Sequence, residues 1–466
     1  MSYNTQKICT AFFPLEKICA DGESDITVIT EKKADTLSVN ARVYDRQKYS
    51  EYKISENEDM ANAMSLLLFN VLSELTSFLP PWGILYGVRP ARLMHRKCEE
   101  LGEQGALEYF TDKCRVNPDK AKLALDVMKA ENKIISLSDE SSFSLYASIP
   151  FCPSRCLYCS FVSHSIENAS GLIEQYVALL CEELKHIAAI AKDLGLHLRT
   201  VYFGGGTPTT LTAGQLELLL DTVEKHFDFS NVLEYTVEAG RPDTVTAEKL
   251  NVLKRYGVTR ISINPQTFND EVLENIGRRH TVQQTVDAFN LAEKLGFDNI
   301  NMDLIAGLDG DTLNSFKSSV DRAVELNAQS ITVHNLSLKS GAFLVTESKN
   351  YDLSMRDVAG KMIDYSALKL RENGYFPYYM YRQSKSLGNL ENVGWCKNGR
   401  ECLYNVYMMD ETHTVLAAGA GAVTKLKNQQ SGHIDRIYNY KYPYEYINGF
   451  DEIINRKTGI YDFYKS

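Results

Sequence analysis

The chain has 466 residues, 44% of them hydrophobic and 24% charged, and its formal net charge is −10. This length predicts two or three domains with an ample core. The acidic balance, without a run rich in lysine or arginine, argues against a nucleic-acid partner, and no apolar stretch is long enough to span a bilayer. Ten cysteines without a signal peptide fit a reducing compartment, so we expect a cytoplasmic protein.

Residues 1–140 are expected to form a separate N-terminal accessory domain of α/β type. Residues 37–54 alternate loosely between apolar and polar side chains, as a pair of strands does. Residues 61–76 have the pattern of an apolar helix, which the prolines and glycine of 80–83 interrupt. Further helices are expected from 92 to 131.

The central segment, 141–345, alternates short strand-like runs with helical periodicity. The six strand-like runs are 146–151, 200–203, 234–238, 260–263, 299–305 and 330–334. The helical segments between them are 172–194, 215–227, 247–256, 282–295 and 312–326. Such alternation predicts βαβ units around a parallel sheet. Six units are too few for a closed eight-stranded barrel, so we expect an open, partial (β/α)6 barrel.

The last segment, 346–466, is expected to be an α+β extension that completes a substrate cavity. A helix is expected near 358–373, followed by aromatic, glycine-rich loops. Tyrosines alternate from Tyr438 to Tyr446, as they would along one face of an edge strand, although packing of an extended tail explains them equally simply.

Cys152, Cys156 and Cys159 form a Cys-x3-Cys-x2-Cys run directly after the first strand of the central segment. Three thiolates this close can bind three irons of one [4Fe–4S] cluster, and the fourth iron is then open to a small chelating molecule. That arrangement is the basis of radical chemistry driven by S-adenosylmethionine. A zinc site would show paired Cys-x2-Cys units or a cysteine and histidine set, and a disulfide framework would need a secreted chain.

Polar residues follow the other strands of the central segment. Gly204-Gly205-Gly206-Thr207-Pro208 closes the second strand, where glycines allow a ligand to approach the backbone closely. Further candidates are Glu238, Gln266 and Arg278, at or after strand ends, and Asp303, inside an otherwise apolar strand. Functional side chains of parallel α/β folds gather at the carboxyl ends of the strands. A structural Glu–Arg pair inside the barrel is the alternative explanation.

Two other cysteines lie close together near the C-terminus. Cys396 and Cys402 are in a predicted loop and could hold a second metal centre, but no third ligand accompanies them.

Several motifs together resemble the oxygen-independent coproporphyrinogen III oxidases of the radical S-adenosylmethionine (SAM) superfamily. They are the cysteine run, the 204–208 loop, Asn264-Pro-Gln-Thr-Phe268, Gly277-Arg-Arg-His280, Asn301-Met-Asp-Leu-Ile-Ala-Gly-Leu308 and the Gly419–Val423 loop. The 81–90 segment, which begins Pro81-Trp-Gly, resembles the extra N-terminal domain of the coproporphyrinogen dehydrogenase HemZ type.

The resemblance implies a [4Fe–4S] cluster, two SAM molecules, a tetrapyrrole substrate and an external electron donor of the flavodoxin or ferredoxin type. Carried over by motif position, the residues contacting the first SAM would be Tyr146, Gly205 and Glu238. Those contacting the second would be Tyr158, Gly206, Thr207, Gln266, Arg278, Asp303, Ser337 and Val423. Arg89, Arg92 and Arg241 are candidate clamps for substrate carboxylates.

The resemblance also implies the reaction. A 5′-deoxyadenosyl radical would take a hydrogen atom from a substrate propionate, which then loses carbon dioxide and one electron and leaves a vinyl group. Two propionates of coproporphyrinogen III react in this way to give protoporphyrinogen IX in haem biosynthesis. The cofactors carry the difficult chemistry, and the protein positions them and excludes water.

Three departures from the family pattern bear on the substrate. Ser148 stands where relatives have a histidine, Ser160 stands where another cysteine follows the triplet, and a segment beginning at Tyr404 replaces a His-Asn-x-x-Tyr-Trp element. A haem-binding chaperone on the same fold and a radical SAM tetrapyrrole methyltransferase are therefore the alternative functions.

Overall fold

The computed structural model describes residues 3–14, 16, 18–19, 24–87, 89–160, 164–337, 354–383 and 386–465. In this part of the chain, one 11-stranded sheet dominates the fold, with strand order β12-β13-β11-β10-β9-β8-β7-β4-β14-β15-β16. Its strands are β4 (Ser142–Ile149), β7 (His197–Gly205), β8 (Glu234–Glu238), β9 (Arg260–Ser262), β10 (Ile300–Ala306), β11 (Ser330–Asn335), β12 (Phe376–Arg382), β13 (Glu391–Cys396), β14 (Thr414–Ala418), β15 (Val423–Lys427) and β16 (Ile434–Tyr438).

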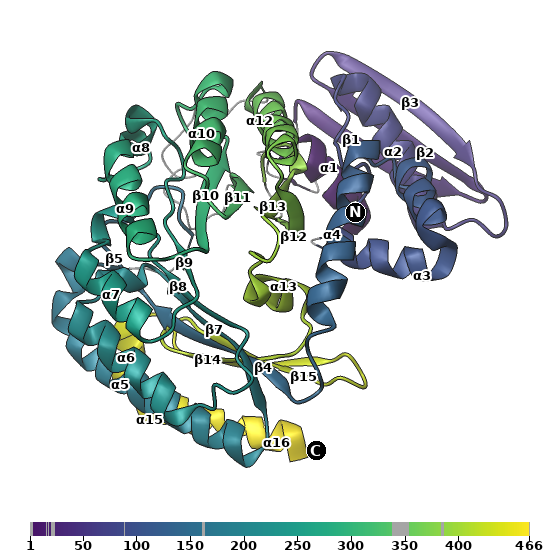
Figure 1. Cartoon of the computed structure of the whole chain (residues 1–466). Helices are drawn as coiled ribbons and strands as arrows, with labels where there is room; N and C mark the ends of the chain where they lie inside the picture. Colours follow the sequence, from purple (N-terminus) through teal and green to yellow (C-terminus); the bar gives the residue numbers. More distant parts are fainter. Residues whose placement is uncertain are drawn as a thin grey trace.

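The six strands predicted for the central segment are confirmed as β4 and β7 to β11. Neighbouring strands among these six pair in parallel. The sheet curves, and helices cover its outer side (Figure 1). These helices are α5 (Ile166–Asp193), α6 (Ala213–His226), α7 (Ala247–Arg255), α8 (Asp270–Asn275), α9 (Val282–Lys294), α10 (Leu313–Glu325) and α12 (Ser354–Glu372). The partial α/β barrel expected from the sequence is therefore the observed architecture.

Threonine caps explain where four of these helices begin. The hydroxyl oxygens of Thr212, Thr246, Thr281 and Thr312 each accept a hydrogen bond from the backbone N–H three residues later. Such a cap satisfies one of the amide groups that have no partner inside the first helical turn. The chain therefore leaves each preceding loop at a defined residue, which fixes the loops at the strand ends.

The expectation of loops after residue 373 is wrong, because this segment forms strands on both edges of the same sheet. β13 pairs antiparallel with β11, whereas β14 pairs parallel with β4. The remaining helices are α13 (Leu403–Asp410), α14 (Pro443–Asn448), α15 (Phe450–Lys457) and α16 (Gly459–Lys465). In β12 apolar and polar residues do not alternate clearly along the sequence, because the strand is buried on both faces.

The predicted edge strand of alternating tyrosines is also wrong. Only Tyr438 belongs to β16, and the chain then turns before α14 begins at Pro443. Proline is favoured in the first turn of a helix, where its missing N–H is not needed.

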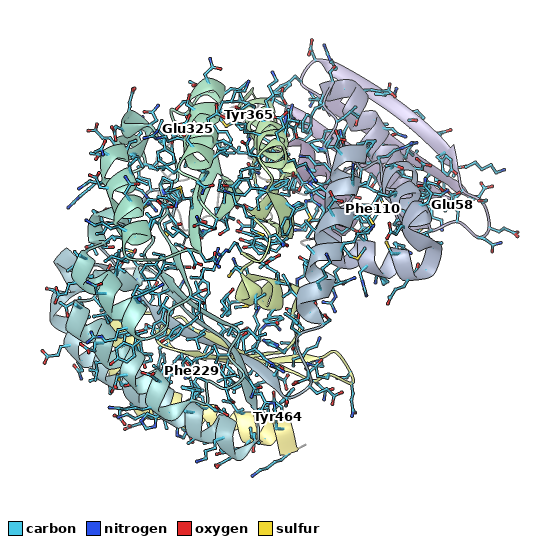
Figure 2. The ribbon with its side chains drawn as sticks, in the orientation of Figure 1. Glu58, Phe110, Phe229, Glu325, Tyr365 and Tyr464 are labelled. Carbon is cyan, nitrogen blue, oxygen red and sulfur yellow. The ribbon has the colours of Figure 1, made fainter. Side chains whose placement is uncertain are left out.

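The N-terminal segment contains a three-stranded antiparallel sheet of order β1-β2-β3. Its elements are α1 (Tyr3–Phe12), β1 (Ile26–Lys33), β2 (Thr36–Val43), β3 (Arg46–Lys53), α2 (Met60–Thr76), α3 (Pro90–Glu108) and α4 (Pro118–Ile135). The sequence predicted β2, β3 and the helices after residue 60 but missed α1 and β1. Figure 2 shows Phe110 inside this segment, where it is fully buried.

The segment packs against the main sheet through α4, which contacts β12. The predicted boundary at 140/141 falls between α4 and β4, whereas the predicted boundary at 345/346 lies outside the described residues. In the described ranges, none of the helices combines the length and the apolar character needed to cross a membrane.

Candidate active site

All three cysteines of the run line one cavity of about 430 Å³ on the inner side of the curved sheet. The Cys152–Cys159 loop follows β4 and the short strand β5 (Phe151–Cys152), which pairs with β6 (His164–Ser165). Two backbone hydrogen bonds tie the loop to the end of β7, from Gly206 N–H to Ile149 O and from Thr207 N–H to Phe151 O, each 2.8 Å long. The cysteines and the glycine loop therefore form one unit.

The glycines of this unit are required by close packing. A Cβ on Gly206 would lie 2.6 Å from the carbonyl oxygen of Phe151 and 3.0 Å from Cys152 Sγ. Gly205 has φ +105°, a conformation that residues with side chains rarely adopt, and its Cβ would lie 2.9 Å from Ser148 Oγ. The backbone of Gly205 and Gly206 thus lines the cavity with no side chain on either residue.

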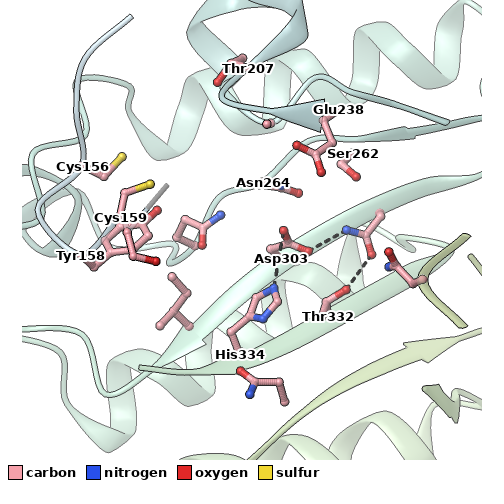
Figure 3. A pocket seen from close by; sticks show the side chains of 18 of the residues that line it. Cys156, Tyr158, Cys159, Thr207, Glu238, Ser262, Asn264, Asp303, Thr332 and His334 are labelled. Atoms are coloured by element: carbon pink, nitrogen blue, oxygen red, sulfur yellow. Dashed lines mark hydrogen bonds and ion pairs between the residues drawn. The ribbon is translucent and has the colours of Figure 1, made fainter. Parts of the chain in front are cut away.

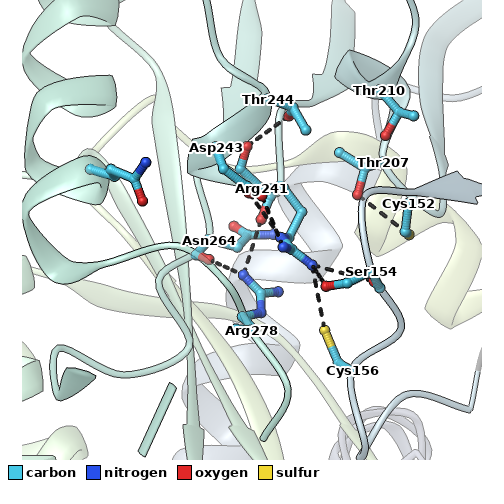
Figure 4. A network of polar contacts seen from close by, with 12 residues as sticks. Cys152, Ser154, Cys156, Thr207, Thr210, Arg241, Asp243, Thr244, Asn264 and Arg278 are labelled. Carbon is cyan, nitrogen blue, oxygen red and sulfur yellow. Dashed lines mark hydrogen bonds and ion pairs between the residues drawn. The ribbon is translucent and has the colours of Figure 1, made fainter. Parts of the chain in front are cut away.

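Arg241 joins the cysteine loop to the third strand-end loop (Figure 4). Its guanidinium donates to both carboxylate oxygens of Asp243, each at 3.0 Å, and to Ser154 Oγ at 3.1 Å. One nitrogen also lies 4.0 Å from Cys156 Sγ. Since Asp243 and the cysteine loop occupy this side chain, the structure places Arg241 beside the cysteines rather than as a clamp for substrate.

The side chains of Arg278 and Tyr158 contact each other at the cavity wall. Arg278 Nη1 donates to the carbonyl oxygen of Asn264 at 2.7 Å, and Nε donates to Tyr158 Oη at 3.2 Å. Burial raises the pKa of the Tyr158 phenol well above its usual value, so the phenol stays neutral. Both residues line the cavity.

Glu238 and Asp303 face the same cavity from β8 and β10 (Figure 3). Desolvation raises the pKa of Glu238 to about 7, although a hydrogen bond from the Tyr202 hydroxyl opposes this shift. Burial would also raise the pKa of Asp303. Its contact with His334, 3.7 Å away, and a 2.8 Å hydrogen bond from Asn301 outweigh burial and keep that pKa below the ordinary value.

Gln266 has an unusual backbone for a residue with a side chain, with φ +69°. Its N–H donates to Asp303 O and its carbonyl accepts from Ile305 N–H, both at 2.9 Å. Non-glycine residues in this conformation cost about 1–3 kcal/mol and cluster at functional sites. Gln266 lines the cavity together with Ser337 and Thr207.

Two predicted cofactor contacts are not brought to the cavity wall. Tyr146 lies behind it, stacked against Tyr202 and Tyr404 with ring centroids 6.2 and 6.0 Å away. Val423 lies on β15 and is not among the residues that line the cavity. The stack also accounts for Tyr404, which is buried in this aromatic layer.

Arg89 and Arg92 likewise do not line the cavity. Both contact Glu411, with Arg89 Nη1 2.5 Å and Arg92 Nη1 3.7 Å from Glu411 Oε2. Cys396 and Cys402 are buried in a second hydrophobic cluster, and burial raises the pKa of both thiols. A raised pKa disfavours the thiolate that a metal requires.

The departures at Ser148 and Ser160 have different structural settings. Ser148 is buried, and its hydroxyl donates to the carbonyl oxygen of Ala420 at 2.8 Å. This hydrogen bond therefore connects β4, the strand before the cysteine loop, to the loop that follows β14. Ser160 is exposed and lines the cavity.

Sequence reasoning missed much of the cavity wall. His334 and Arg260 come from strands that were predicted, and a polar residue in an apolar strand was the available signal. Tyr379 and Tyr381 on β12, and Met408 and Met409 on α13, belong to a segment expected to be loops. Nothing local in the sequence marks these four as part of the site.

The donors present fit an iron–sulfur cluster and a polar organic cofactor. Three cysteines face one end of the cavity, although in the described residues no three His, Cys, Asp or Glu side chains are arranged to hold a metal ion. Asn264 Oδ1 and Asn335 Oδ1 are buried without a hydrogen-bond partner, and both residues line the cavity. Buried polar atoms of this kind are expected to bind a ligand or water.

Comparisons with known proteins identify the class to which this fold and this cysteine loop belong. The chain matches the radical SAM superfamily over residues 146–323. The solved structure of coproporphyrinogen III oxidase (HemN) from Escherichia coli, described as a radical SAM enzyme, shares the fold with a TM-score of 0.54 and 23% identity, covering 70% of this chain and 72% of that one.

Curated relatives narrow the assignment. The chain is 36% identical over 406 residues to the oxygen-independent coproporphyrinogen-III oxidase-like protein HemZ of Bacillus subtilis, covering 86% of this chain and 81% of that protein. It is 33% identical over 310 residues to the heme chaperone HemW of the same organism, covering 65% and 77%. The chain belongs to the oxygen-independent coproporphyrinogen III oxidase family, HemZ type, and this membership implies a [4Fe–4S] cluster and SAM.

Proposed function

We propose that this protein converts propionate side chains of coproporphyrinogen III to vinyl groups without oxygen, forming protoporphyrinogen IX in haem biosynthesis. Per propionate, one hydrogen atom leaves the carbon next to the pyrrole ring and the carboxylate departs as carbon dioxide. One electron passes to an external one-electron acceptor, and a carbon–carbon double bond remains. We place the reaction in the cytoplasm, where cluster cysteines stay reduced.

One observation carries the proposal: a single cavity joins the cysteine loop to the inner wall formed by the C-terminal segment. At one end are Cys152, Cys156 and Cys159, and at the other are Tyr379, Met408 and further side chains of β12 and α13. Aromatic and methionine side chains suit a large flat ligand. The cluster and SAM, when bound, would supply the radical that takes the hydrogen atom.

We assign the cluster to the three cysteines and the first SAM to Tyr146, Gly205 and Glu238. The residues proposed for a second SAM are Tyr158, Gly206, Thr207, Gln266, Arg278, Asp303, Ser337 and Val423. Nine of these eleven cofactor contacts share the cavity, which supports the assignment. For Tyr146 and Val423 we expect an indirect role, since neither residue lines the cavity.

We also propose three segments with distinct roles: an N-terminal accessory domain (1–140), the radical SAM partial barrel (141–345) and a C-terminal segment (346–466) that completes the cavity. The third assignment is supported by β12 and α13, whose side chains form part of the cavity wall. An electron donor of the flavodoxin or ferredoxin type would reduce the cluster.

An anaerobic assay tests the function. The reconstituted protein is given dithionite, SAM and coproporphyrinogen III, and mass spectrometry follows 5′-deoxyadenosine and stepwise loss of carbon dioxide. Both products are expected, and Cys156→Ala should abolish them while Cys98→Ala, on α3 away from the cavity, should not. Deoxyadenosine without change in the porphyrinogen would refute the substrate, and a methylated product would favour a methyltransferase.

A haem-binding chaperone is the second candidate, because relatives such as HemW carry that name and because His334, Met408 and Met409, all suitable iron ligands, line the cavity. Haem titration followed by absorbance separates the two functions. Stoichiometric haem binding that His334→Ala abolishes, without turnover of coproporphyrinogen, would favour the chaperone.

A further inference from the structure

Glu411, directly after α13, lies among three arginines from distant parts of the chain. Arg89 Nη1 is 2.5 Å and Arg92 Nη1 is 3.7 Å from Glu411 Oε2, and Arg436 Nη2 is 3.4 Å from Oε1. Arg89 and Arg92 belong to the N-terminal segment, whereas Arg436 is on β16. The carboxylate of Glu411 is therefore bound much as a small carboxylate ligand would be, by several guanidinium groups.

Basic side chains outnumber acidic ones in this cluster, where Arg89 also interacts with Asp410 and Glu131. Lys425 and Lys427 on β15 are close enough to interact with the arginines. Burial lowers the pKa of both lysines; attraction by Glu411 opposes this shift, and repulsion from nearby arginines adds to it. Such repulsion in a chain of net charge −10 indicates that cations are concentrated here.

The cluster lies beside the substrate end of the cavity. Lys425 Nζ is 3.0 Å from the sulfur of Met408, and Met408 lines the cavity. In Figure 1, α13 lies on the inner side of the curved sheet, near α4 and β15. The Met408 side chain thus lies between Lys425, one member of the cluster, and the space that the proposed substrate would occupy.

We infer that Arg89, Arg92, Arg436, Lys425 and Lys427 form a binding site for propionate carboxylates of the tetrapyrrole, in which Glu411 stands in for the ligand when none is bound. The identity of the ligand rests on the proposed function. The substrate carries four carboxylates, of which two do not react, and these need cationic partners wherever they leave the cavity.

The arrangement around Glu411 suits an exchange of carboxylates. Its side chain is 12% exposed, whereas those of Arg92 and Arg436 are 52% and 41% exposed. Arg92 and Arg436 are therefore partly accessible to a ligand from solvent. Glu411 also has φ +58°, a strained conformation for a glutamate, which its ion pairs help to hold.

Binding of coproporphyrin III, the stable oxidised form of the substrate, tests this inference without any turnover. Glu411→Gln removes the competing charge and should tighten binding severalfold, whereas Arg92→Ala and Arg436→Ala should each weaken it about tenfold. Fluorescence titration measures the affinities. Coproporphyrin III tetramethyl ester has the same ring without the charges, and its affinity should be unchanged by all three substitutions.

Asp126→Asn is the matched control, because it breaks the 2.8 Å ion pair between Asp126 and Arg371 at a different contact of the N-terminal segment. It should leave porphyrin affinity unchanged. Thermal unfolding of each variant confirms that it folds, so a loss of binding cannot be taken for a loss of structure.

The outcomes separate this site from the proposed function. If Glu411→Gln leaves coproporphyrin affinity unchanged or weaker, or if acid and ester respond alike, Glu411 serves only as a link between segments and the inference is overturned. If the wild-type protein binds neither porphyrin, the tetrapyrrole assignment itself fails.

Discussion

Glu238 and Asp303 line one cavity, and their local surroundings shift their pKa values in opposite directions. For Glu238 desolvation outweighs the hydrogen bond from the Tyr202 hydroxyl and raises the pKa to about 7. Asp303 has His334 and Asn301 beside it and keeps a lowered pKa. At neutral pH one side chain is thus fully charged and the other partly protonated.

This difference predicts a pH dependence of stability for the protein without cofactors. Because the pKa of Glu238 in the folded chain, about 7, exceeds its ordinary value of 4.5, the folded state holds an extra proton between these values. The contribution to the free energy of unfolding is complete below pH 4.5 and is lost as the pH rises through 7.

Glu238→Gln should remove that dependence. Between pH 5 and pH 8, the wild-type free energy of unfolding should fall by about 2 kcal/mol more than that of the variant, as measured by urea denaturation at both values. Equal pH profiles for the two proteins would show that burial does not shift this carboxyl group.

Gly206 gives a second prediction at the scale of one residue. In Gly206→Ala the new Cβ meets the Phe151 carbonyl at 2.6 Å and Cys152 Sγ at 3.0 Å, so the cysteine loop must shift. Reconstituted iron content and visible absorbance should fall to a small fraction of the wild-type values. Gly214→Ala on α6 is the control, since its Cβ meets nothing within 4 Å, and it should retain full iron content.

At the scale of elements, α13 is held at both ends by contacts with parts of the chain that lie far away in the sequence. The buried Glu234 of β8 accepts hydrogen bonds from the N–H groups of Leu403 at 2.7 Å and Tyr404 at 3.3 Å. At the other end, Glu411 pairs with Arg89. The helix that carries Met408 and Met409 into the cavity therefore depends on the barrel at one end and on the N-terminal segment at the other.

Glu234→Ala should loosen α13. The loss of a helix cap and of a buried acceptor should cost about 1–3 kcal/mol in unfolding free energy and should speed proteolysis within 403–410. Asp59→Ala removes the cap of α2, whose carboxylate accepts from Ala61 N–H, and serves as control. It should lower stability without changing porphyrin affinity, whereas Glu234→Ala should lower both.

At the scale of the whole molecule, one buried ion pair joins the N-terminal segment to the main sheet. Lys120 on α4 donates to Glu391 Oε1 at 2.7 Å, and Trp82 Nε1 donates to Oε2 at 2.7 Å. The side chains of Lys120 and Glu391 are both nearly inaccessible to solvent. Glu391 begins β13, and the next residue, Asn392, lines the cavity. The position of the accessory segment is thereby coupled to the site.

Lys120→Met should leave Glu391 charged, buried and unpaired. A loss of about 3–5 kcal/mol in unfolding free energy is expected, because breaking one side of a buried pair strands the other charge. Replacing both residues, as in Lys120→Met with Glu391→Leu, should recover most of this loss. Lys129→Met, which breaks an exposed pair with Glu103, should cost less than about 1 kcal/mol.

The sequence by itself determined the parts of the protein that depend on neighbours along the chain. The spacing of Cys152, Cys156 and Cys159, the six parallel strands with their helices, and the glycines after β7 were all predicted. These features follow from periodicity, turn chemistry and ligand spacing, which operate over a few residues. Gln266 and Arg278 were chosen because strand ends of a parallel sheet meet at one edge, and Asp303 because a carboxylate inside an apolar strand is unlikely to face the hydrophobic shell.

Only the tertiary structure decided which distant segments complete the site. Tyr379 enters the cavity because β12 pairs with β13 and packs on α4, and Met408 does so because α13 packs on α4, β7 and β12. Arg89, a candidate clamp for substrate carboxylates, lies outside the cavity wall and contacts Glu411, 322 residues away. Tyr146 is covered by Tyr202 and Tyr404. Such contacts depend on packing between surfaces far apart in the chain, which no local pattern encodes.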